Sequence, residues 1–251
     1  MDEAASHRQR AGELAALNRS FYDGLWSQAR LVAPERFNTW PLVKVLAATA
    51  ERRLEVAPGL RPRLPLAGTR FLDMSANAVA GLRARGAQAT VGLIDAIPFA
   101  DASFDLVCAC DIVEHVEDDE AALRELARVA APGATLLLSV PLHEEAWTPF
   151  DDLVGHYRRY APGELAGKLD RHGFAVERSA VYGMQPKSSR LLDVGMWYLM
   201  HQRERAMWWY NRVIMPLGLR RQKPLRFRTG LIDDDGVDTV LVVCRRLAAD
   251  S

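Results

Sequence analysis

The chain has 251 residues, and its 32 Lys and Arg residues are balanced by 32 Asp and Glu residues, so its formal net charge is zero. With 49% hydrophobic and 25% charged residues it has the composition of a folded domain. This composition excludes intrinsic disorder for most of the chain and gives no overall positive charge for binding nucleic acid. The 17 Gly and 13 Pro residues follow no period, which excludes a collagen-like fibre.

The cysteines and the N-terminus bear on the compartment of the protein. Cys108, Cys110 and Cys244 lack the spacing of a disulfide framework or of a zinc site, so we expect buried thiols and no metal ion. Residues 1–17 are charged throughout and lack the apolar core of a signal peptide. No run reaches the roughly 18 apolar residues of a membrane span. We therefore expect a cytoplasmic protein.

The first 50 residues have a helical pattern. Apolar residues recur at intervals of three or four from Leu14 to Leu25 and again from Leu42 to Leu46, with Pro34 between the two segments. The sequence therefore predicts an N-terminal helical cap over residues 1–50, followed by an α/β domain over residues 51–251.

From residue 51 onward, short apolar runs of strand type alternate with helical patterns, which predicts a doubly wound α/β fold with a mostly parallel sheet. Phe104 to Cys110 is a nearly continuous apolar run, as expected of a strand buried on both faces. Ser75 and Asp118 have the character of helix starts. The predicted strands are 53–56, 69–72, 88–93, 104–110, 135–140 and 174–179, and the predicted helices follow Ser75, extend from Asp118 to Ala130 and cover 163–172.

The C-terminal part of the sequence predicts a helical insertion followed by a hairpin. Residues 185–227 contain three of the six Trp residues and a helical spacing of apolar residues. Between Met196 and Arg228, eight Lys and Arg residues occur with a single acid, Glu204. Residues 230–232 and 239–245 flank an Asp-rich turn that ends in Asp-Gly, and such a turn predicts a hairpin.

Acidic residues follow several predicted strands at the point where each strand ends, and ligands of open parallel sheets bind outside these carboxyl ends. Glu55 begins a tight turn through Ala57 and Gly59 that lets the backbone approach a ligand. A carboxylate at Asp73 can accept both hydroxyls of a ribose, and one at Asp95 can accept the exocyclic amine of an adenine. Taken alone, each carboxylate is more readily a simple loop residue or a helix cap than a ligand-binding group.

Three segments resemble a known family. Residues 97–107 have the sequence IPFADASFDLV, residues 114–116 EHV and residues 126–134 LARVAAPGA. This string is similar to the class I S-adenosylmethionine-dependent methyltransferases, above all those with small-molecule acceptors, over roughly residues 51–182. The resemblance implies a seven-stranded Rossmann-like sheet, S-adenosylmethionine as the cofactor and S-adenosylhomocysteine as its product.

The resemblance also assigns a cofactor site to residues at the ends of the strands. It implies that Asp73 binds the ribose, that Met74 packs on the adenine and that Asp111 lies beside the methionine portion. The residues that we expect to contact the cofactor are Glu55, Ala57, Gly59, Asp73, Met74, Asp95, Ala96, Asp111, Ile112 and His115.

One motif departs from the family pattern. The first loop of the family carries an acid followed by three alternating glycines, whereas residues 55–61 have the sequence EVAPGLR and keep only the middle one, Gly59. We expect Ala57 to be tolerated if its φ is negative, and Arg61 to add bulk and charge near the exit of the loop. These departures predict a shifted or weakened cofactor site.

Candidate acceptor-site residues come mainly from the segment after the strand that ends at Pro141. Methyl transfer needs alignment and exclusion of water, and a hydroxyl acceptor also needs a general base. His156 is the first candidate base and His143 the second, although His156 can equally serve to hydrogen-bond the next helix. Arg158 either binds an acidic acceptor or anchors the acids at 151–152. The residues that we expect to contact the acceptor are Trp26, Trp40, Tyr157, Arg158 and Tyr160.

Three interpretations of residues 185–227 stay open. The segment can be an additional helical layer with a solvated basic face, or a lid whose aromatic and Met side chains build an apolar acceptor pocket. It can also be a surface that lies on an anionic membrane, the least favoured of the three.

The sequence as a whole predicts a methyltransferase that acts on an O, N or C atom of a small, partly apolar acceptor, for instance in secondary metabolism. The alternatives are an enzyme of the same fold with a non-methylating reaction, such as a cyclisation or elimination, and a non-catalytic partner subunit. No GxGxxG motif opens the sheet, which disfavours a nicotinamide-dependent dehydrogenase. We expect a monomer or homodimer without a nucleic-acid partner.

Overall fold

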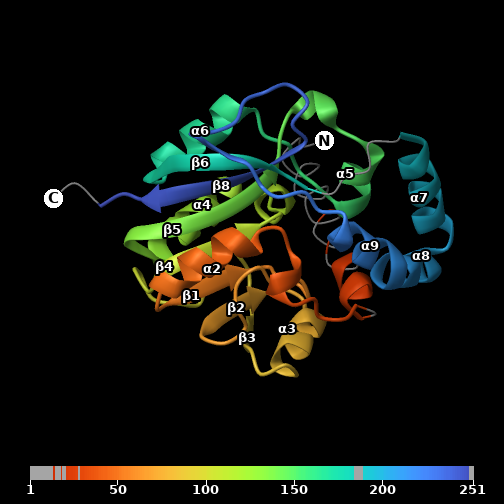
Figure 1. The fold of residues 1–251 in the computed structure, drawn as a ribbon, viewed down its shortest axis with the longest axis horizontal. Helices are drawn as coiled ribbons and strands as arrows, with labels where there is room; N and C mark the ends of the chain where they lie inside the picture. Colours follow the sequence, from red (N-terminus) through yellow and green to blue (C-terminus); the bar gives the residue numbers. More distant parts are fainter. Residues whose placement is uncertain (1–13, 15–17, 19–20, 28, 184–188, 249–251) are drawn as a thin grey trace, which may run out of the picture.

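The chain is built on one eight-stranded sheet with helices on both faces (Figure 1). The computed structural model describes residues 14, 18, 21–27, 29–183 and 189–248. Along the sheet the strands follow the order β3-β2-β1-β4-β5-β8-β6-β7, so the chain enters in the interior and winds outward in two directions. The predicted doubly wound α/β fold is confirmed.

Strands β1 to β5 form a continuous parallel half of the sheet. Their bounds are β1 (Arg53–Val56), β2 (Thr69–Asp73), β3 (Gln88–Val91), β4 (Phe104–Cys110) and β5 (Ala130–Pro141). Most residues of β4 and of β5 are buried, because helices cover both faces of the sheet at its centre. This is why continuous apolar runs, rather than alternation, predicted these strands.

The predicted C-terminal hairpin is wrong. The edge strand is β7 (Phe227–Thr229) rather than residues 230–232, and it pairs with β6 (Phe174–Tyr182). Strand β8 (Thr239–Arg246) inserts between β5 and β6 and runs antiparallel to both. Residues 239–244 are all buried, and a strand without a polar face is stable only inside a covered sheet. The sheet therefore has eight strands rather than seven.

One face of the sheet is covered by α4 (Asp119–Val129) and α6 (Pro162–Arg171), and the other by α2 (Trp40–Thr49) and α3 (Ala76–Arg83). The predicted helix starts are confirmed. The Ser75 hydroxyl accepts a hydrogen bond from the backbone N–H of Ala78, and the Asp118 carboxylate accepts one from that of Ala121.

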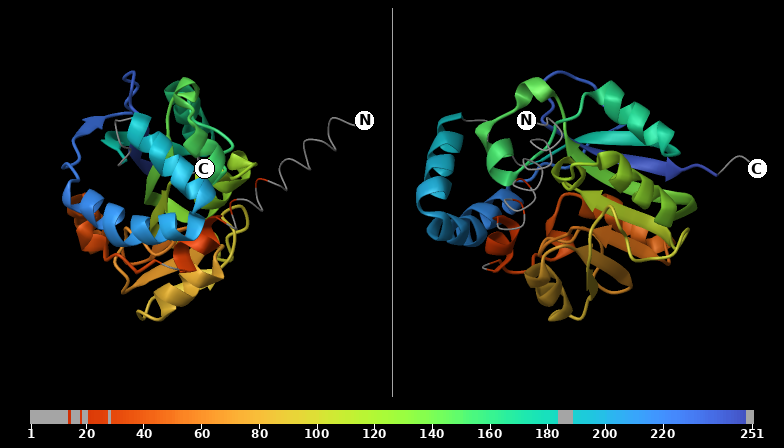
Figure 2. Two further views of the ribbon diagram at one scale, coloured as in Figure 1. Left: turned by 90° about the vertical axis from the view of Figure 1, so that its right-hand side faces the viewer. Right: turned by 180° about the vertical axis from the view of Figure 1, so that it is seen from behind.

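A group of four short helices projects beside the sheet (Figure 2). We call residues 189–220 the helical arm; it consists of α7 (Ser189–His201), α8 (Arg203–Trp209), the π-helical turn η4 (Tyr210–Ile214) and α9 (Met215–Arg220). Its inner side packs on the N-terminal helical residues 21–27, where Met207 joins a buried cluster with Phe21 and Leu25. The predicted helical insertion is confirmed over these residues, whereas positions 185–188 lie outside the described part of the chain.

The remaining elements are short and lie in the connections. They are the 3-10 turns η1 (Pro34–Arg36), η2 (Val113–His115) and η3 (Glu144–Ala146) and the helix α5 (Pro149–Val154). Among the described residues, no helix is long and apolar enough to cross a membrane. The division of the chain at residue 50 stays a prediction, as does the pattern over residues 1–13, which lie outside the described residues.

Candidate functional site

The loop after β1 is held from below by Glu55. This carboxylate is buried, and its two oxygens accept hydrogen bonds from the backbone N–H groups of Arg63, at 2.7 Å, and Leu64, at 2.8 Å. Burial raises the pKa of Glu55 to about 7. Both oxygens of Glu55 accept hydrogen bonds from the chain's own backbone and so shape the loop, and its predicted contact with the cofactor stays a prediction.

Asp73 ends β2 beside the same loop. One carboxylate oxygen accepts the N–H of Gly59 and the other accepts the N–H of Ser75, each at 2.8 Å. Each oxygen keeps a second lone pair for a hydroxyl donor. Burial raises the pKa of Asp73 to about 6, although the two backbone hydrogen bonds oppose this shift.

Ala57 was expected to be tolerated in this loop if its φ angle is negative, and the structure contradicts this condition. Its φ is +53°, in the left-handed region that glycine adopts without strain, whereas the expectation required a negative φ. The backbone of this loop therefore keeps the shape that a glycine would give it, and the methyl group of Ala57 adds strain.

Ala57→Gly is expected to raise the free energy of unfolding by up to about 1 kcal/mol, because it relieves a left-handed alanine. The matched control is Ala80→Gly on an exposed position of α3, which should lower the same quantity by about 1 kcal/mol. Urea denaturation of both variants measures this. If Ala57→Gly destabilises as much as Ala80→Gly, the loop is not strained at this position.

Arg61, which replaces the third glycine of the family motif, connects the loop to the helical arm. Its guanidinium lies 5.1 Å from the ring centroid of Trp26 and 5.0 Å from that of Tyr210. It also donates hydrogen bonds to the Tyr210 hydroxyl, at 3.3 Å, and to the Asn211 side chain, at 3.2 Å. The large, charged side chain of Arg61, expected near the exit of the loop, therefore contacts the helical arm.

Trp26 covers the loop at Gly59. A Cβ atom added to Gly59 would lie 2.1 Å from the indole ring, so no residue larger than glycine fits beneath it. Trp26 was predicted to contact the acceptor, and the structure places its indole ring against Gly59 in the loop after β1. Trp40, the other predicted tryptophan, begins α2 and packs on the cluster beneath that helix.

The other residues assigned to the cofactor lie at the ends of β2, β3 and β4. Asp111 directly follows β4 with a φ of +53°, and its exposed side chain accepts a hydrogen bond from the Ser139 hydroxyl at 2.6 Å. Met74 and Ile112 are half-buried, and Asp95 and Ala96 are exposed in the turn beyond β3. The backbone N–H of Gly92 bonds the carbonyl of Asp73 at 3.1 Å, which fixes the end of β3 beside that of β2.

His115 lies in a buried polar network with two residues of the N-terminal segment. The amide nitrogen of Asn18 donates to the Gly155 carbonyl at 2.9 Å, so the Asn18 oxygen faces His115 and accepts from its Nδ1 at 3.0 Å. The Nε2 atom then carries a lone pair and accepts the hydroxyl of Tyr22 at 3.0 Å. Burial lowers the pKa of His115 well below its ordinary value, in keeping with this neutral ring.

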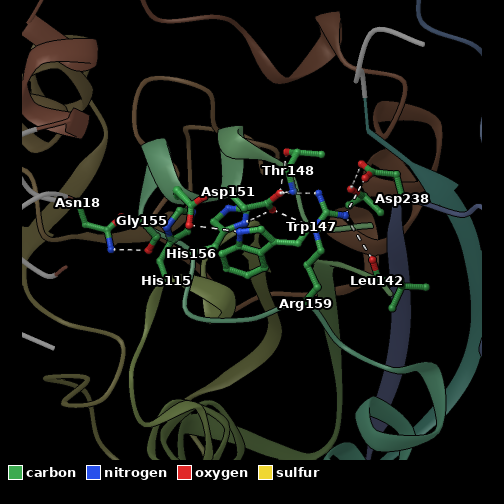
Figure 3. A network of polar contacts seen from close by, with 12 residues as sticks. Asn18, His115, Leu142, Trp147, Thr148, Asp151, Gly155, His156, Arg159 and Asp238 are labelled. Carbon is green, nitrogen blue, oxygen red and sulfur yellow. Dashed lines mark hydrogen bonds and ion pairs between the residues drawn. The ribbon is translucent and has the colours of Figure 1, made fainter. Parts of the chain in front are cut away.

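His156 is oriented by a buried carboxylate (Figure 3). Its Nδ1 lies 2.8 Å from the Oδ1 atom of Asp151, five residues earlier, whose side chain is fully buried. Thr148 and the guanidinium of Arg159 also donate to Asp151, the latter at 2.9 and 3.0 Å. Burial alone would raise the pKa of Asp151, but the hydrogen bonds from His156, Arg159 and Thr148 hold it below its usual range.

The two histidines meet next to a third titratable residue. The rings of His115 and His156 are 4.5 Å apart in an edge-to-face arrangement. Glu114 is buried beside them, and one of its oxygens has no hydrogen-bond partner among the described residues. Burial, together with the charge of Asp111, raises the pKa of Glu114 well above its ordinary value, which favours the protonated acid.

Glu114, His115 and His156 also have the geometry of a metal site, since their ligand atoms all lie within 4.8 Å of one another. The sequence predicted no metal ion. Both ring nitrogens of His115 already have hydrogen-bond partners, which favours the polar network over a metal centre.

Two of the predicted acceptor-site residues have structural roles. Tyr160 is buried, and its hydroxyl donates to Asp119 at 2.9 Å, so the prediction that it contacts the acceptor is corrected. Arg158 donates to the carbonyl of Glu117 at 2.6 Å and pairs with Asp119 at 3.1 Å. The predicted pairing of Arg158 with the acids at 151–152 is therefore wrong. Arg158 pairs with Asp119, and Arg159 pairs with Asp151.

Tyr157 and His143 are the two remaining residues that the sequence assigned to the acceptor or the base. The backbone N–H of Tyr157 bonds the carbonyl of Glu114 at 2.8 Å, which places Tyr157 beside the histidine pair. His143, the second candidate base, has a φ of +63°, and its Nδ1 lies 3.5 Å from the exposed carboxylate of Glu145. No buried carboxylate orients His143 among the described residues.

Sequence reasoning did not assign three members of this network. Asn18 and Glu114 act through contacts with residues far apart in the chain, and no local pattern marks such contacts. Asp151 was named only as a partner for an arginine, although an acid five residues before a candidate histidine base was an available signal.

Comparisons with known proteins agree with this geometry. A family described as a methyltransferase domain matches residues 61–138. The malonyl-[acyl-carrier protein] O-methyltransferase of Erwinia billingiae is 39% identical over 87 residues, which cover 32% of this chain and 34% of that protein. The chain spans less than two thirds of the length of the first curated relatives it matches.

Solved structures of the same fold align over most of the chain. A possible histamine N-methyltransferase of Thermotoga maritima, described as dependent on S-adenosylmethionine, superposes with a TM-score of 0.57 at 15% identity, covering 96% of this chain and 95% of its own. The [4+2]-cyclase SpnF superposes with a TM-score of 0.54 at 16% identity, over 83% of this chain and 80% of its own. At these identities the likeness shows the fold.

The domain match, the fold and the acids at the ends of β2 and β4 agree with one another. Residues 61–138 therefore match a methyltransferase domain family, and the whole chain has the fold of solved S-adenosylmethionine-dependent methyltransferases.

Proposed function

We propose that this protein transfers the methyl group of S-adenosylmethionine to a hydroxyl or amine of a small, partly apolar acceptor, with His156 as the general base. The observation that carries the proposal is the buried Asp151–His156 pair beside the end of β4, next to the strand ends that carry Asp73 and Asp111. A role in secondary metabolism remains a hypothesis about the acceptor.

The residues at the strand ends fit the cofactor. Asp73 offers one lone pair on each oxygen to the two ribose hydroxyls, and the exposed carboxylate of Asp111 is available to the amine of the methionine portion. S-adenosylmethionine supplies a methyl group bound to a sulfonium sulfur. When this methyl group is transferred, the sulfur departs as a neutral thioether, which is a good leaving group. The protein then has to align the acceptor, exclude water and receive a proton.

His156 suits the last of these tasks. The Nδ1–H of its ring donates to Asp151, so the lone pair of Nε2 is free to accept a proton from the acceptor. The Asp151 carboxylate, kept ionised by Arg159 and Thr148, stabilises the imidazolium that forms. The neutral His115 next to it adds no positive charge that would oppose this proton transfer.

The walls around this base favour an acceptor with apolar surface. Tyr22 stacks on Trp26 with ring centroids 6.2 Å apart and meets His115 edge to face at 5.3 Å. Both aromatic side chains come from the N-terminal helical residues 21–27, and Tyr22 would keep water from the His115 side of the histidine pair. Among the residues of the site that the structure describes, none favours a cyclisation or elimination over methyl transfer.

The proposal is tested by supplying S-adenosylmethionine with a labelled methyl group together with a panel of phenols, amines and carboxylic acids. Transfer of label to a phenol or amine, with release of S-adenosylhomocysteine, is the expected result. Labelling of carboxylic acids alone would contradict the role of a general base, because a carboxylate has no proton to give up at neutral pH.

Asp73→Asn is expected to weaken S-adenosylhomocysteine binding by roughly 100-fold, because an amide cannot accept two hydroxyl donors while it also faces two backbone N–H groups. Calorimetric titration measures the loss. Asp105→Asn, which changes an acid on β4 that pairs with Arg52, is the matched control and should bind like the wild type. Equal affinity of a folded Asp73→Asn variant would remove Asp73 from the site.

Cofactor affinity should also depend on pH. The carboxylate form of Asp73 accepts the ribose hydroxyls, and its pKa is about 6, so affinity is complete above that pH and falls as the pH drops below it. We expect a loss of up to about tenfold per pH unit below 6 in the titrations. The Asp73→Asn variant should lack this step, and an identical profile in both proteins would assign the titration to another group.

A further inference from the structure

The helical arm has an outer surface that the proposed function does not use. Large apolar side chains on the outer positions of this arm are exposed: Val194, Trp197, Met200, Trp208, Trp209, Ile214 and Leu217. Trp197, Trp208 and Trp209 are each about half exposed, at 56%, 46% and 49%. In the part of the chain that the structure describes, more than half of the large exposed apolar side chains lie on this arm.

These side chains are not scattered at random along the arm. Val194, Trp197 and Met200 follow one another at intervals of three residues on α7, which places them on one side of the helix. Trp208 and Trp209 end α8, with ring centroids 5.3 Å apart. The inner side of α8 is occupied, because Ala206 and Met207 are buried and Met207 packs with Phe21 and Leu25 of the N-terminal helix. The apolar surface therefore faces away from the rest of the protein.

The arm and the residues that follow it directly are strongly basic in a chain of zero net charge. Between Met196 and Arg226 seven cationic side chains are exposed and one acid, Glu204, accompanies them. They are Arg203, Arg205, Arg212, Arg220, Arg221, Lys223 and Arg226. None of the seven forms an ion pair with another residue that the structure describes, whereas Arg228, just beyond them, pairs with Asp234.

Exposed tryptophans next to unpaired arginines match the chemistry of one partner. Trp side chains place an apolar ring and an N–H donor at the boundary between lipid tails and headgroups, and arginines bind lipid phosphates. A polyanion such as a nucleic acid would satisfy the charge but would leave the Val, Met, Ile and Leu side chains in water. A bilayer with anionic headgroups can accommodate both the apolar side chains and the arginines.

We propose that the outer surface of the helical arm binds the surface of an anionic lipid bilayer without crossing it. The short helices of the arm would lie in the interface with their tryptophans among the headgroups. The inner side of the same arm contacts Arg61 through Tyr210 and Asn211. Binding would therefore bring the loop after β1, where we propose that the cofactor binds, to the membrane surface. This inference does not depend on the reaction that the site catalyses.

Vesicle sedimentation with the full chain tests the proposal. We expect binding to vesicles of equal parts phosphatidylcholine and phosphatidylglycerol, weak binding to phosphatidylcholine alone, and release when the salt rises from about 0.1 M to about 0.5 M. Trp208→Ala with Trp209→Ala should lower the partition coefficient at least about tenfold. Arg220→Glu with Arg221→Glu should lower it by at least as much.

The control is Val45→Ser, which removes an apolar side chain that is 64% exposed on α2, away from the arm, and should bind vesicles like the wild type. Cofactor titrations on the same variants should be unchanged, so that loss of vesicle binding is not mistaken for unfolding. Equal binding by Val45→Ser, the double tryptophan variant and the wild type would overturn the proposal. So would a wild-type protein that ignores anionic vesicles and forms a dimer that the tryptophan substitutions dissociate.

Discussion

Asp151→Ala is expected to lower the free energy of unfolding by about 3–5 kcal/mol, the largest effect on stability that we predict for a single substitution. Asp151 and Arg159 both have fully buried side chains, and they meet through two hydrogen bonds in the paired geometry of a carboxylate and a guanidinium. Without Asp151 the guanidinium keeps only Asp238, at 2.8 Å, and the carbonyl of Leu142, at 3.3 Å. A buried charge with too few partners destabilises the fold.

The effect should depend on pH in a defined direction. The pKa of Asp151 lies below its usual range in the folded protein, so the pair contributes fully above the ordinary carboxyl pKa of about 4. The contribution is lost as the pH falls through the lower folded pKa. The stability difference between wild type and Asp151→Ala should therefore be constant from neutral pH down to about 5 and shrink in stronger acid.

Urea denaturation measures the loss, and an exposed ion pair provides the control. Asp105→Ala removes the partner of Arg52 in a pair that is partly exposed on both sides, at 55% and 33%, and should cost less than about 1 kcal/mol. Arg159→Met should cost several kcal/mol by the same argument as Asp151→Ala. If both network variants lose no more than the Asp105→Ala control, the network does not stabilise the fold.

Local signals explain why most of the sheet could be predicted. Continuous apolar runs predict buried strands such as β4. The helix starts at Ser75 and Asp118 have side chains that cap a helix. The prediction of the hairpin was wrong because the turn at Asp233 to Gly236 suggests that β8 pairs with the residues just before the turn. In the structure β8 pairs with β5 and β6 instead. Its fully buried residues 239–244 require neighbours on both edges, and only β5 and β6 offer them.

The site divides in the same way. The acids at strand ends could be predicted because the ends of parallel strands meet at one edge of the sheet. The environment of His115 could not, because Asn18 and Tyr22 reach it from more than 90 residues away in the chain. Arg61 shows a third case. It departs from the family motif and predicted a weakened site, and the structure explains its size by a contact with the helical arm 149 residues later in sequence.

His156→Gln is expected to reduce kcat about 10²- to 10⁴-fold with an acceptor whose hydroxyl or amine must lose a proton. Glutamine keeps a side chain that can bond Asp151 but offers no basic nitrogen to the acceptor. The affinity for S-adenosylhomocysteine should stay within about threefold of the wild type, because the proposed cofactor site at Asp73 and the loop at Gly59 does not include His156.

His143→Gln is the matched control, since His143 is the second candidate base and lies close to the end of β5. Its nearest acid, Glu145, is exposed and 3.5 Å away, so nothing buried holds the ring for proton transfer. We expect less than about a tenfold change in kcat for His143→Gln. The reverse result, a large loss with His143→Gln and a small one with His156→Gln, would move the base to the other histidine. It would leave the Asp151–His156–Arg159 network with a structural role, because the same buried hydrogen bonds that orient a base also hold α5 against β5.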